Sequence, residues 1–239
     1  SHELKGREAG TEWGHIAGEY LVAVLKQMGA TPLFGNSFVQ PFKGYSLYYS
    51  KASGYTVVPE GIEQIKKGPY RVANMHNVLA KIEGKNPDEI VVVGAHYDHL
   101  GYDPMLADDF IYNGADDNAS GVQAVLQILQ AFLATGQQPE RTVIFALWDG
   151  EEKGLCGSKY FVNNFADIKK VKGYMNFDMI GRDCVEDRKN HFNFMYTAKD
   201  SVYAEWLKND IKQYSLALNP NYNSSDDFSR GSDQVPFFN

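Results

Sequence analysis

The chain has 239 residues and lacks any run of about eighteen apolar residues, so the sequence predicts no membrane-spanning helix. Its 44% hydrophobic and 22% charged residues are typical of a globular domain with a sizeable core. The formal charge of -7, without a dense cluster of Lys and Arg, argues against nucleic acid as a partner.

The first 70 residues predict one helix and an irregular segment. Apolar residues recur at helical spacing from Thr11 to Gly29, with Thr11 placed to cap the start of the helix and Gly29 its end. Residues 35–70 are rich in Gly, Ser, Tyr and Pro. We expect them to form an extended segment with an edge hairpin built from Tyr45–Tyr49 and Tyr55–Val58.

From residue 77 onward, predicted strands alternate with predicted helices. The predicted strands are 77–82, 90–95 (IVVVGA), 142–147 (TVIFAL), 171–177 and 192–196, and the predicted helices are 119–134, 158–165 and one capped by Asp200. The continuous apolar runs are typical of strands that are covered on both faces. The alternation predicts an α/β fold, with a mostly parallel, mixed and twisted sheet that carries helices on both faces.

Acids and imidazoles follow three of these strands and fill one intervening loop. His96, Asp98 and His99 follow the first buried strand, Asp149, Glu151 and Glu152 the second, and Asp178 the third, while Asp116 and Asp117 lie in the loop before the helix at Ala119. In open α/β sheets the ligand site lies at the carboxyl ends of the strands. We therefore expect these side chains to gather at one edge of the sheet.

Such a gathering of acids predicts a divalent metal site. Carboxylates that converge with only His96 and His99 as nearby bases in the sequence repel one another unless a cation lies among them. Imidazole nitrogen with carboxylate oxygen and no thiolate suits zinc, with manganese or cobalt as alternatives. The surplus of acids over the three ligands of a single catalytic zinc fits a two-metal site with a bridging carboxylate.

Taken one at a time, these residues have simpler explanations. Asp116, Asp117, Asn118 and Ser120 could cap the following helix. His99 by itself is better explained by packing or by a contact with a metal ligand than as a ligand, and His2, His15, His76 and His191 show no partner pattern. Cys156 and Cys184 are too few for a disulfide framework; we expect small buried thiols, with a disulfide between them as the less favoured alternative.

Read together, the motifs resemble those of a known enzyme family. The segments GAHYDHLG, NGADDNASG, WDGEEKGLCGS and NFDMIGR, in this order, resemble the co-catalytic zinc aminopeptidases. That family includes bacterial leucyl aminopeptidases, glutamate carboxypeptidases and glutaminyl cyclases. The opening LKGREAGT and the segment NVLAKIEG are similar to its N-terminal segment and first strand, so the resemblance extends over most of the chain.

The resemblance implies a role for each motif residue. His96, Asp117, Glu152 and Asp178 match metal ligands, with Asp117 as the carboxylate that bridges two zinc ions and Asp116 as the alternative. Glu151 matches the general base, and Asp98 matches the acid that orients His96. The implied activity is hydrolysis of the N-terminal peptide bond by a water that two zinc ions activate, in peptides with a free N-terminus.

The C-terminal part departs from the family pattern. The family's fifth ligand is a histidine near the C-terminus, and no histidine follows His191 here. The stretch Gly231-Ser232-Asp233-Gln234 resembles a Ser-Asp-His stretch that precedes the last strand. We therefore expect residues 1–239 to form one metallopeptidase domain that stops before its last strand and helix.

Other functions stay open within the resemblance. The alternatives are a glutaminyl cyclase-like acyltransferase with a single zinc and a non-catalytic peptide-binding relative. The opening Ser-His-Glu-Leu-Lys-Gly-Arg has no apolar signal region. The family resemblance implies an exported protein that is periplasmic, lipid-anchored or secreted. The sequence predicts no particular oligomeric state.

Overall fold

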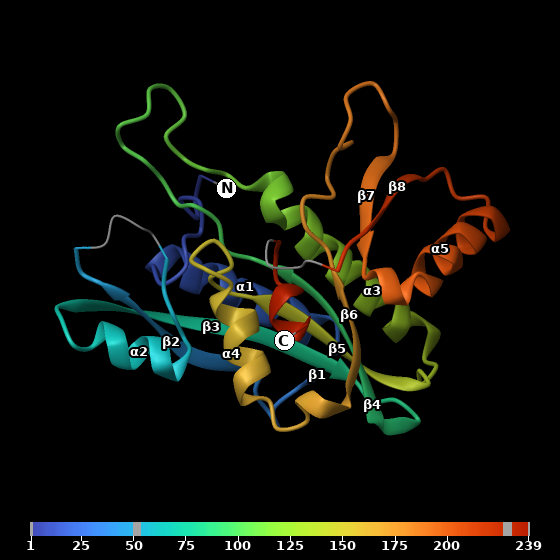
Figure 1. The fold of residues 1–239 in the computed structure, drawn as a ribbon, viewed down its shortest axis with the longest axis horizontal. Helices are drawn as coiled ribbons and strands as arrows, with labels where there is room; N and C mark the ends of the chain where they lie inside the picture. The colour runs from blue at the N-terminus through green and yellow to red at the C-terminus, as the bar shows by residue number, and fades with distance from the viewer. Residues whose placement is uncertain (1, 50–53, 227–230, 239) are drawn as a thin grey trace. The chain divides into compact units, whose positions relative to one another are not determined.

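The computed structural model describes residues 2–49, 54–226 and 231–238, and these fall into two compact units. The first unit comprises residues 1–179 and 232–239, and the second comprises residues 180–231. Each unit is built around its own sheet (Figure 1).

A mixed sheet of six strands forms the first unit. The strands are β1 (Thr31–Pro32), β2 (Val39–Leu47), β3 (Tyr70–Ile82), β4 (Asn86–His96), β5 (Arg141–Trp148) and β6 (Val171–Asn176). Their order is β1-β3-β5-β4-β6, and β2 also pairs with β3. β3 runs antiparallel to its three neighbours, whereas β4 runs parallel to β5 and β6. The parallel strands β5, β4 and β6 therefore end at the same edge.

Helices cover both faces of this sheet. They are α1 (Glu12–Gln27), α2 (Pro59–Ile65), α3 (Gly121–Thr135) and α4 (Cys156–Asn164). Phe145 of β5 packs in one cluster with residues of α1 and α3, while its neighbour Ile144 packs with Phe161 of α4 on the other face. Successive side chains of a strand point to opposite faces, so a strand with both faces buried reads as an unbroken apolar run. The predicted α/β fold with a mixed sheet is confirmed, but the sheet is not mostly parallel, because all three pairings of β3 are antiparallel.

The local predictions agree with the structure in most places. Thr11 caps α1 by accepting a hydrogen bond from the Gly14 N–H. Residues 35–70 are more regular than predicted, because they contain the nine-residue strand β2 and the helix α2. In place of the predicted hairpin, Tyr45 pairs with Thr56 by one isolated bridge, and residues 50–53 lie outside the described residues.

The second unit is a small β-α-β arrangement. Strands β7 (His191–Tyr196) and β8 (Asn219–Ser224) pair in parallel, and α5 (Val202–Gln213) connects them. The predicted strand 192–196 exists, but its partner is β8 and not a strand of the main sheet. The sequence of β8, NPNYNS, is mostly polar and mostly exposed, so it carries no strand signal of its own.

Two further expectations for this unit are wrong. The predicted cap, Asp200, accepts a hydrogen bond from the Thr197 hydroxyl, and the residue at the start of α5 is Ser201. Cys184 is exposed rather than buried, and its Sγ lies 2.8 Å from Nδ1 of His191. Cys156 is buried in the first unit as expected, and both cysteines are free thiols.

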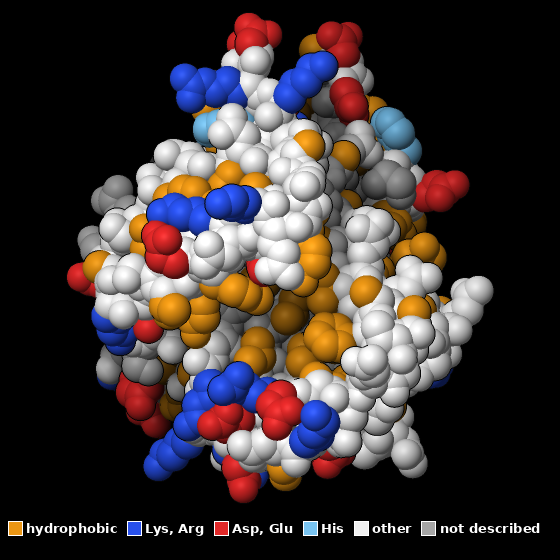
Figure 2. All heavy atoms as spheres, turned by 90° about the vertical axis from the view of Figure 1, so that its right-hand side faces the viewer, with side chains coloured by type: hydrophobic (Ala, Val, Ile, Leu, Met, Phe, Trp, Pro, Cys, Tyr) orange, Lys and Arg blue, Asp and Glu red, His pale blue; other side chains and the backbone are white. Residues whose placement is uncertain are grey.

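The surface carries charges of both signs. On the face drawn in Figure 2, Lys and Arg side chains are interspersed with Asp and Glu. Within the part of the chain that the structure describes, no helix is long and apolar enough to cross a membrane.

Candidate metal centre

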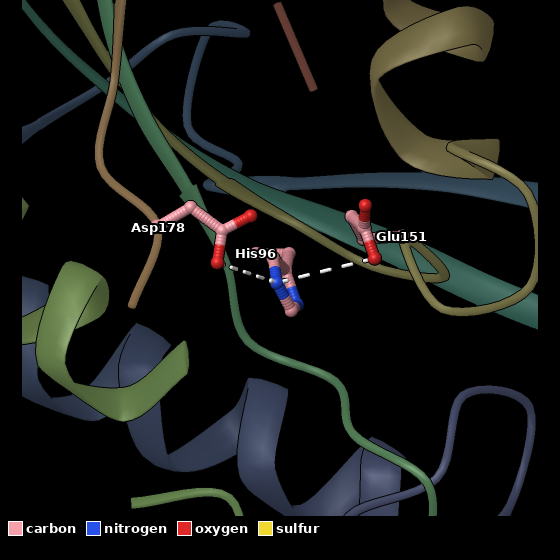
Figure 3. Close-up of side chains that lie close together, drawn as sticks. All are labelled: His96, Glu151 and Asp178. Atoms are coloured by element: carbon pink, nitrogen blue, oxygen red, sulfur yellow. Dashed lines mark ion pairs between the residues drawn. The ribbon is translucent and has the colours of Figure 1, made fainter. Parts of the chain in front are cut away.

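The predicted site residues meet at the edge where β5, β4 and β6 end. His96 is the last residue of β4, Glu151 and Glu152 follow β5, and Asp178 follows β6. Figure 3 shows Glu151 and Asp178 on either side of the His96 ring. The fifth residue, Asp117, comes from the kinked segment Ala115–Ser120 that precedes α3, and its own backbone angles are not helical. The topology therefore brings the four predicted segments together.

Three carboxylates surround one nitrogen of His96. Its Nε2 lies 3.2 Å from Asp117 Oδ1, 3.6 Å from Asp178 Oδ1 and 4.0 Å from Glu151 Oε2. The other nitrogen, Nδ1, lies 3.2 Å from the backbone carbonyl of Asp98. If Nδ1 carries the proton and donates it to this carbonyl, Nε2 of the neutral ring has only a lone pair. That lone pair then faces carboxylate oxygens, which are also acceptors.

This juxtaposition of acceptors suits a cation. Among the described residues, Asp178 Oδ1 is buried without a hydrogen-bond partner. The imidazole can remove the conflict by taking a proton: burial lowers the pKa of His96, but Asp117, Asp178 and Asp98 outweigh this and raise it well above its ordinary value. A divalent ion would neutralise the same nitrogen and oxygen atoms with more positive charge than a proton. The ligand atoms of His96, Glu151 and Asp178 lie within 4.8 Å of one another.

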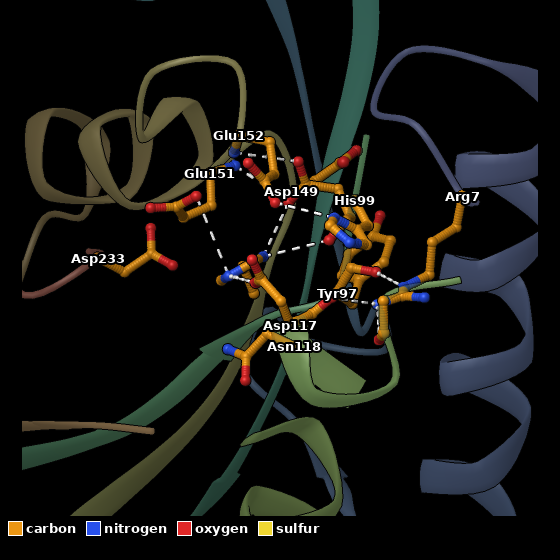
Figure 4. Close-up of polar contacts among 12 residues, drawn as sticks. Arg7, Tyr97, His99, Asp117, Asn118, Asp149, Glu151, Glu152 and Asp233 are labelled. Carbon is orange, nitrogen blue, oxygen red and sulfur yellow. Dashed lines mark hydrogen bonds and ion pairs between the residues drawn. The ribbon is translucent and has the colours of Figure 1, made fainter. Parts of the chain in front are cut away.

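A second group of candidate metal ligands lies next to the group formed by His96, Glu151 and Asp178. His99, Asp117 and Glu152 also place ligand atoms within 4.8 Å of one another. His99 Nδ1 is 3.0 Å from Glu152 Oε1, so the contact with a candidate ligand that we expected for His99 is present (Figure 4). Asp117 thus lies close to His96 of the first group and also belongs to the second.

Asp117, and not its neighbour Asp116, faces His96. The hydrogen bond from His96 lowers the pKa of Asp117 and keeps this carboxyl ionised. The Asp116 backbone carbonyl instead accepts the Ser120 hydroxyl at 2.7 Å. Asn118 contacts the start of α3, because its Oδ1 accepts the Gly121 N–H at 3.0 Å. Capping therefore explains Asn118 but leaves the Asp117 carboxylate available.

Asp98 is fully buried beneath the pair of glutamates. Its carboxylate accepts the backbone N–H of Glu151 at 3.0 Å and that of Glu152 at 3.3 Å. The same carboxylate lies 3.6 Å from Nδ1 of His96, which is longer than a normal hydrogen bond. In this arrangement Asp98 holds the backbone of both glutamates as well as lying beside His96.

The environment makes Glu151 a weak acid. Burial raises its pKa to about 8, and the nearby Asp233 adds to this rise, whereas His96 opposes it. A bound divalent cation would shift that pKa downward again. A carboxyl group balanced between its two protonation states near neutral pH is suited to accept and return a proton.

Several residues at the site were given no role by the sequence analysis. Asp149 and Asp233 are buried acids whose pKa values are raised by burial, to about 8 and about 7 respectively. Arg7, which was not counted among the nearby bases in the sequence, lies close enough to Asp98, Asp117 and Glu152 for their charges to oppose the lowering of its pKa by burial. Lys153 pairs with Glu8 instead. Arg7 lies ninety residues from Tyr97, whose carbonyl it contacts, and no local pattern reveals such a contact.

The fold and this cluster define a class of protein: an α/β domain with a histidine and several carboxylates gathered at the carboxyl edge of its parallel strands. Residues 77–239 match peptidase family M28, and the chain belongs to this family. The resemblance that the motifs suggested is confirmed.

Individual relatives agree with this assignment. An aminopeptidase of Pseudomonas aeruginosa is 39% identical over 130 residues, which cover 54% of this chain and 21% of that protein. The leupeptin-inactivating enzyme 1 of Streptomyces exfoliatus is 39% identical over 111 residues, which cover 46% of this chain and 23% of that protein. The chain therefore spans roughly a quarter or less of these curated relatives.

Solved structures share the fold at low sequence identity. LapA aminopeptidase of Legionella pneumophila superposes with a TM-score of 0.64 at 20% identity, covering 98% of this chain and 54% of that one. A glutaminyl cyclase from an Acidobacteriales bacterium superposes with a TM-score of 0.63 at 18% identity, covering 98% and 70%. At this identity the likeness supports the fold alone.

Proposed function

We propose that the chain carries the catalytic site of a zinc-dependent aminopeptidase with two metal ions. The observation that carries the proposal is the position of Asp117, which lies 3.2 Å from His96 and also within reach of Glu152 and His99. We assign His96 and Asp178 to one ion, Glu152 to the other, and Asp117 to both. Imidazole nitrogen and carboxylate oxygen are ligands that zinc prefers.

When bound, such ions supply an acidified water and a contact that polarises the scissile carbonyl. The residues of the chain handle the proton. Glu151, with Oε2 4.0 Å from Nε2 of His96, takes a proton from the attacking water and returns it to the departing amine nitrogen. Asp98 fixes the position of Glu151 through its backbone N–H. The surrounding acids attract the ammonium group of a free N-terminus.

The proposal is tested by hydrolysis of an aminoacyl anilide with and without a chelator. We expect activity that the chelator removes and that added zinc restores, and no cleavage of the same substrate with an acetylated N-terminus. Chelator-resistant activity, or equal cleavage of the acetylated substrate, would contradict the proposal. The family resemblance also implies an exported protein, which cell fractionation would test.

The role of Glu151 has its own variant. Glu151→Gln should lower turnover at least ~100-fold while leaving the metal content unchanged, because the amide cannot accept the proton. Glu140→Gln, which alters an exposed surface ion pair with Lys85, is the matched control and should behave as the wild type. A Glu151→Gln variant with normal turnover would contradict the assignment of Glu151 as the proton acceptor.

The second candidate is a glutaminyl cyclase, because the family that the four motifs resemble also includes such enzymes. A cyclase with one zinc would release ammonia from peptides that begin with Gln, and would bind one metal per chain. Metal analysis together with both substrates separates the two functions.

A further inference from the structure

The loops that carry the candidate site are joined by an N-terminal segment, Gly6-Arg7-Glu8, which lies far from them in the sequence. The backbone carbonyl of Gly6 accepts the Gly101 N–H at 3.2 Å, and that of Arg7 accepts the His99 N–H at 3.3 Å. Glu8 accepts a hydrogen bond at 2.7 Å from Lys153, the residue after the glutamate pair. The segment therefore contacts the loops that follow both β4 and β5.

Arg7 makes the most extensive of these contacts. Its side chain is buried, with the residue 7% exposed, and its guanidinium donates to four backbone carbonyls, two of which belong to Tyr97 and Asp117, labelled in Figure 4. These are the carbonyls of Tyr97 at 2.6 Å, Asn113 at 2.7 Å, Gly114 at 2.6 Å and Asp117 at 3.1 Å. One planar group thus ties the residue after His96 to the turn that presents Asp117.

The choice of arginine follows from this geometry. A guanidinium presents five N–H donors in a rigid fork, whereas a lysine ammonium is a single point charge on a flexible stem. Carbonyl groups that converge from two loops need donors that point in several fixed directions at once. The burial of Arg7 lowers its pKa, while the field of Asp98, Asp117 and Glu152 opposes this effect and favours the charged form.

We propose that Arg7 is a positioning residue for the metal centre: its guanidinium fixes the backbone of Asp117 relative to His96, so that both side chains can bind one ion. This rests on the proposed metal site but adds a residue outside its ligands. Ligand positions must be held to within about 0.5 Å for tight binding, and loops hold them less accurately than strands. Asp117 lies in such a loop, and Arg7 supplies the missing restraint.

The test compares Arg7→Lys and Arg7→Gln with Arg141→Lys. Arg141 is the first residue of β5, at the opposite end of that strand from the site, and it forms an exposed ion pair with Glu89. Arg141→Lys therefore makes the same chemical change as Arg7→Lys at a position far from the candidate ligands. The first measurement is the apparent zinc affinity of the metal-free protein, determined against a competing chelator well below the unfolding temperature. We expect a loss of 10–100-fold for both Arg7 variants, as for other partners of metal ligands, and none for Arg141→Lys.

The second measurement needs no metal. Amide hydrogen exchange of residues 113–120 in the metal-free protein should be at least ~10-fold faster in the Arg7 variants, while exchange in β4 stays unchanged. Zinc affinity and exchange equal to those of the wild type, with only a lower unfolding temperature, would overturn the proposal. So would two Arg7 variants that fail to fold, since the role would then be global.

The outcomes are separable from those of the proposed function. Metal binding that depends on Arg7 in a protein without peptidase activity would refute the aminopeptidase and leave the positioning role intact. If the wild type binds no divalent metal, the proposed function fails, and the exchange comparison still decides whether Arg7 holds the Asp117 turn.

Discussion

At the scale of single residues, the carboxylate of Asp117 connects the two groups of candidate ligands. Oδ1 lies 3.2 Å from His96, and the hydrogen bond from His96 lowers the pKa of Asp117. Asp116, one residue earlier, contacts Ser120. Adjacent acids in the same turn thus have different surroundings, and only one of them faces the histidine.

This difference predicts unequal effects of two equivalent substitutions. Asp117→Asn should lower zinc affinity more than ~10-fold, because a shared ligand loses its charge, whereas Asp116→Asn should bind zinc as the wild type does. Metal content after dialysis, measured by elemental analysis, compares the two directly. Loss of metal from Asp116→Asn alone would reverse the assignment.

At the scale of elements, α3 is the helix whose N-terminal turn presents Asp117. Its other end is closed by Gly136 in the left-handed conformation, at φ 61°, and the backbone N–H of Gly136 bonds to the Leu133 carbonyl. Such a cap suits glycine because a Cβ is unfavourable at positive φ. Among the described atoms, nothing lies within 4 Å of where that Cβ would be, so the cost of a side chain is conformational alone.

Gly136→Ala should therefore lower the free energy of unfolding by about 1 kcal/mol without changing metal affinity. Gly68→Ala is the control: the space there is equally open, but the backbone is outside the left-handed region, so the change should be below about 0.5 kcal/mol. Urea unfolding of both variants measures the difference. Equal effects would show that the conformation of Gly136 carries no special cost.

At the scale of the whole molecule, buried titratable groups couple stability to pH. His76 of β3 is 4% exposed, and among the described residues its Nδ1 has no hydrogen-bond partner. Burial, together with the nearby His15, lowers its pKa to about 4. In the unfolded chain this histidine has a pKa of about 6.5, so it binds a proton at pH values where the folded protein leaves it neutral. Acid therefore favours the unfolded state between about pH 6.5 and pH 4.

This linkage predicts how a substitution changes the pH dependence. Between pH 7 and pH 4.5, the wild type should lose about 2 kcal/mol more unfolding free energy than His76→Gln, which has no group to titrate. The exposed His2→Gln is the control and should follow the wild type. Urea unfolding of metal-free protein at both pH values measures the effect, and parallel losses in all three proteins would contradict it.

Local pattern in the sequence predicted much of the first unit. The apolar runs of β4 and β5 identified strands with both faces covered, and the acids that follow them identified the edge that carries the candidate site. These predictions succeed because strand burial and strand ends are properties of neighbouring residues. The motif order also sufficed to indicate the family, which the match over residues 77–239 confirms.

Only the tertiary structure decided which distant groups meet. It placed β7 beside β8, brought Arg7 to the carbonyl of Asp117, and buried Asp233 near Glu151. A periodic pattern states which face of a segment is apolar, but it does not state which segment will cover that face. Arg7 donates to backbone carbonyls, which every residue carries. The identity of the accepting residues therefore does not indicate which of them will contact Arg7.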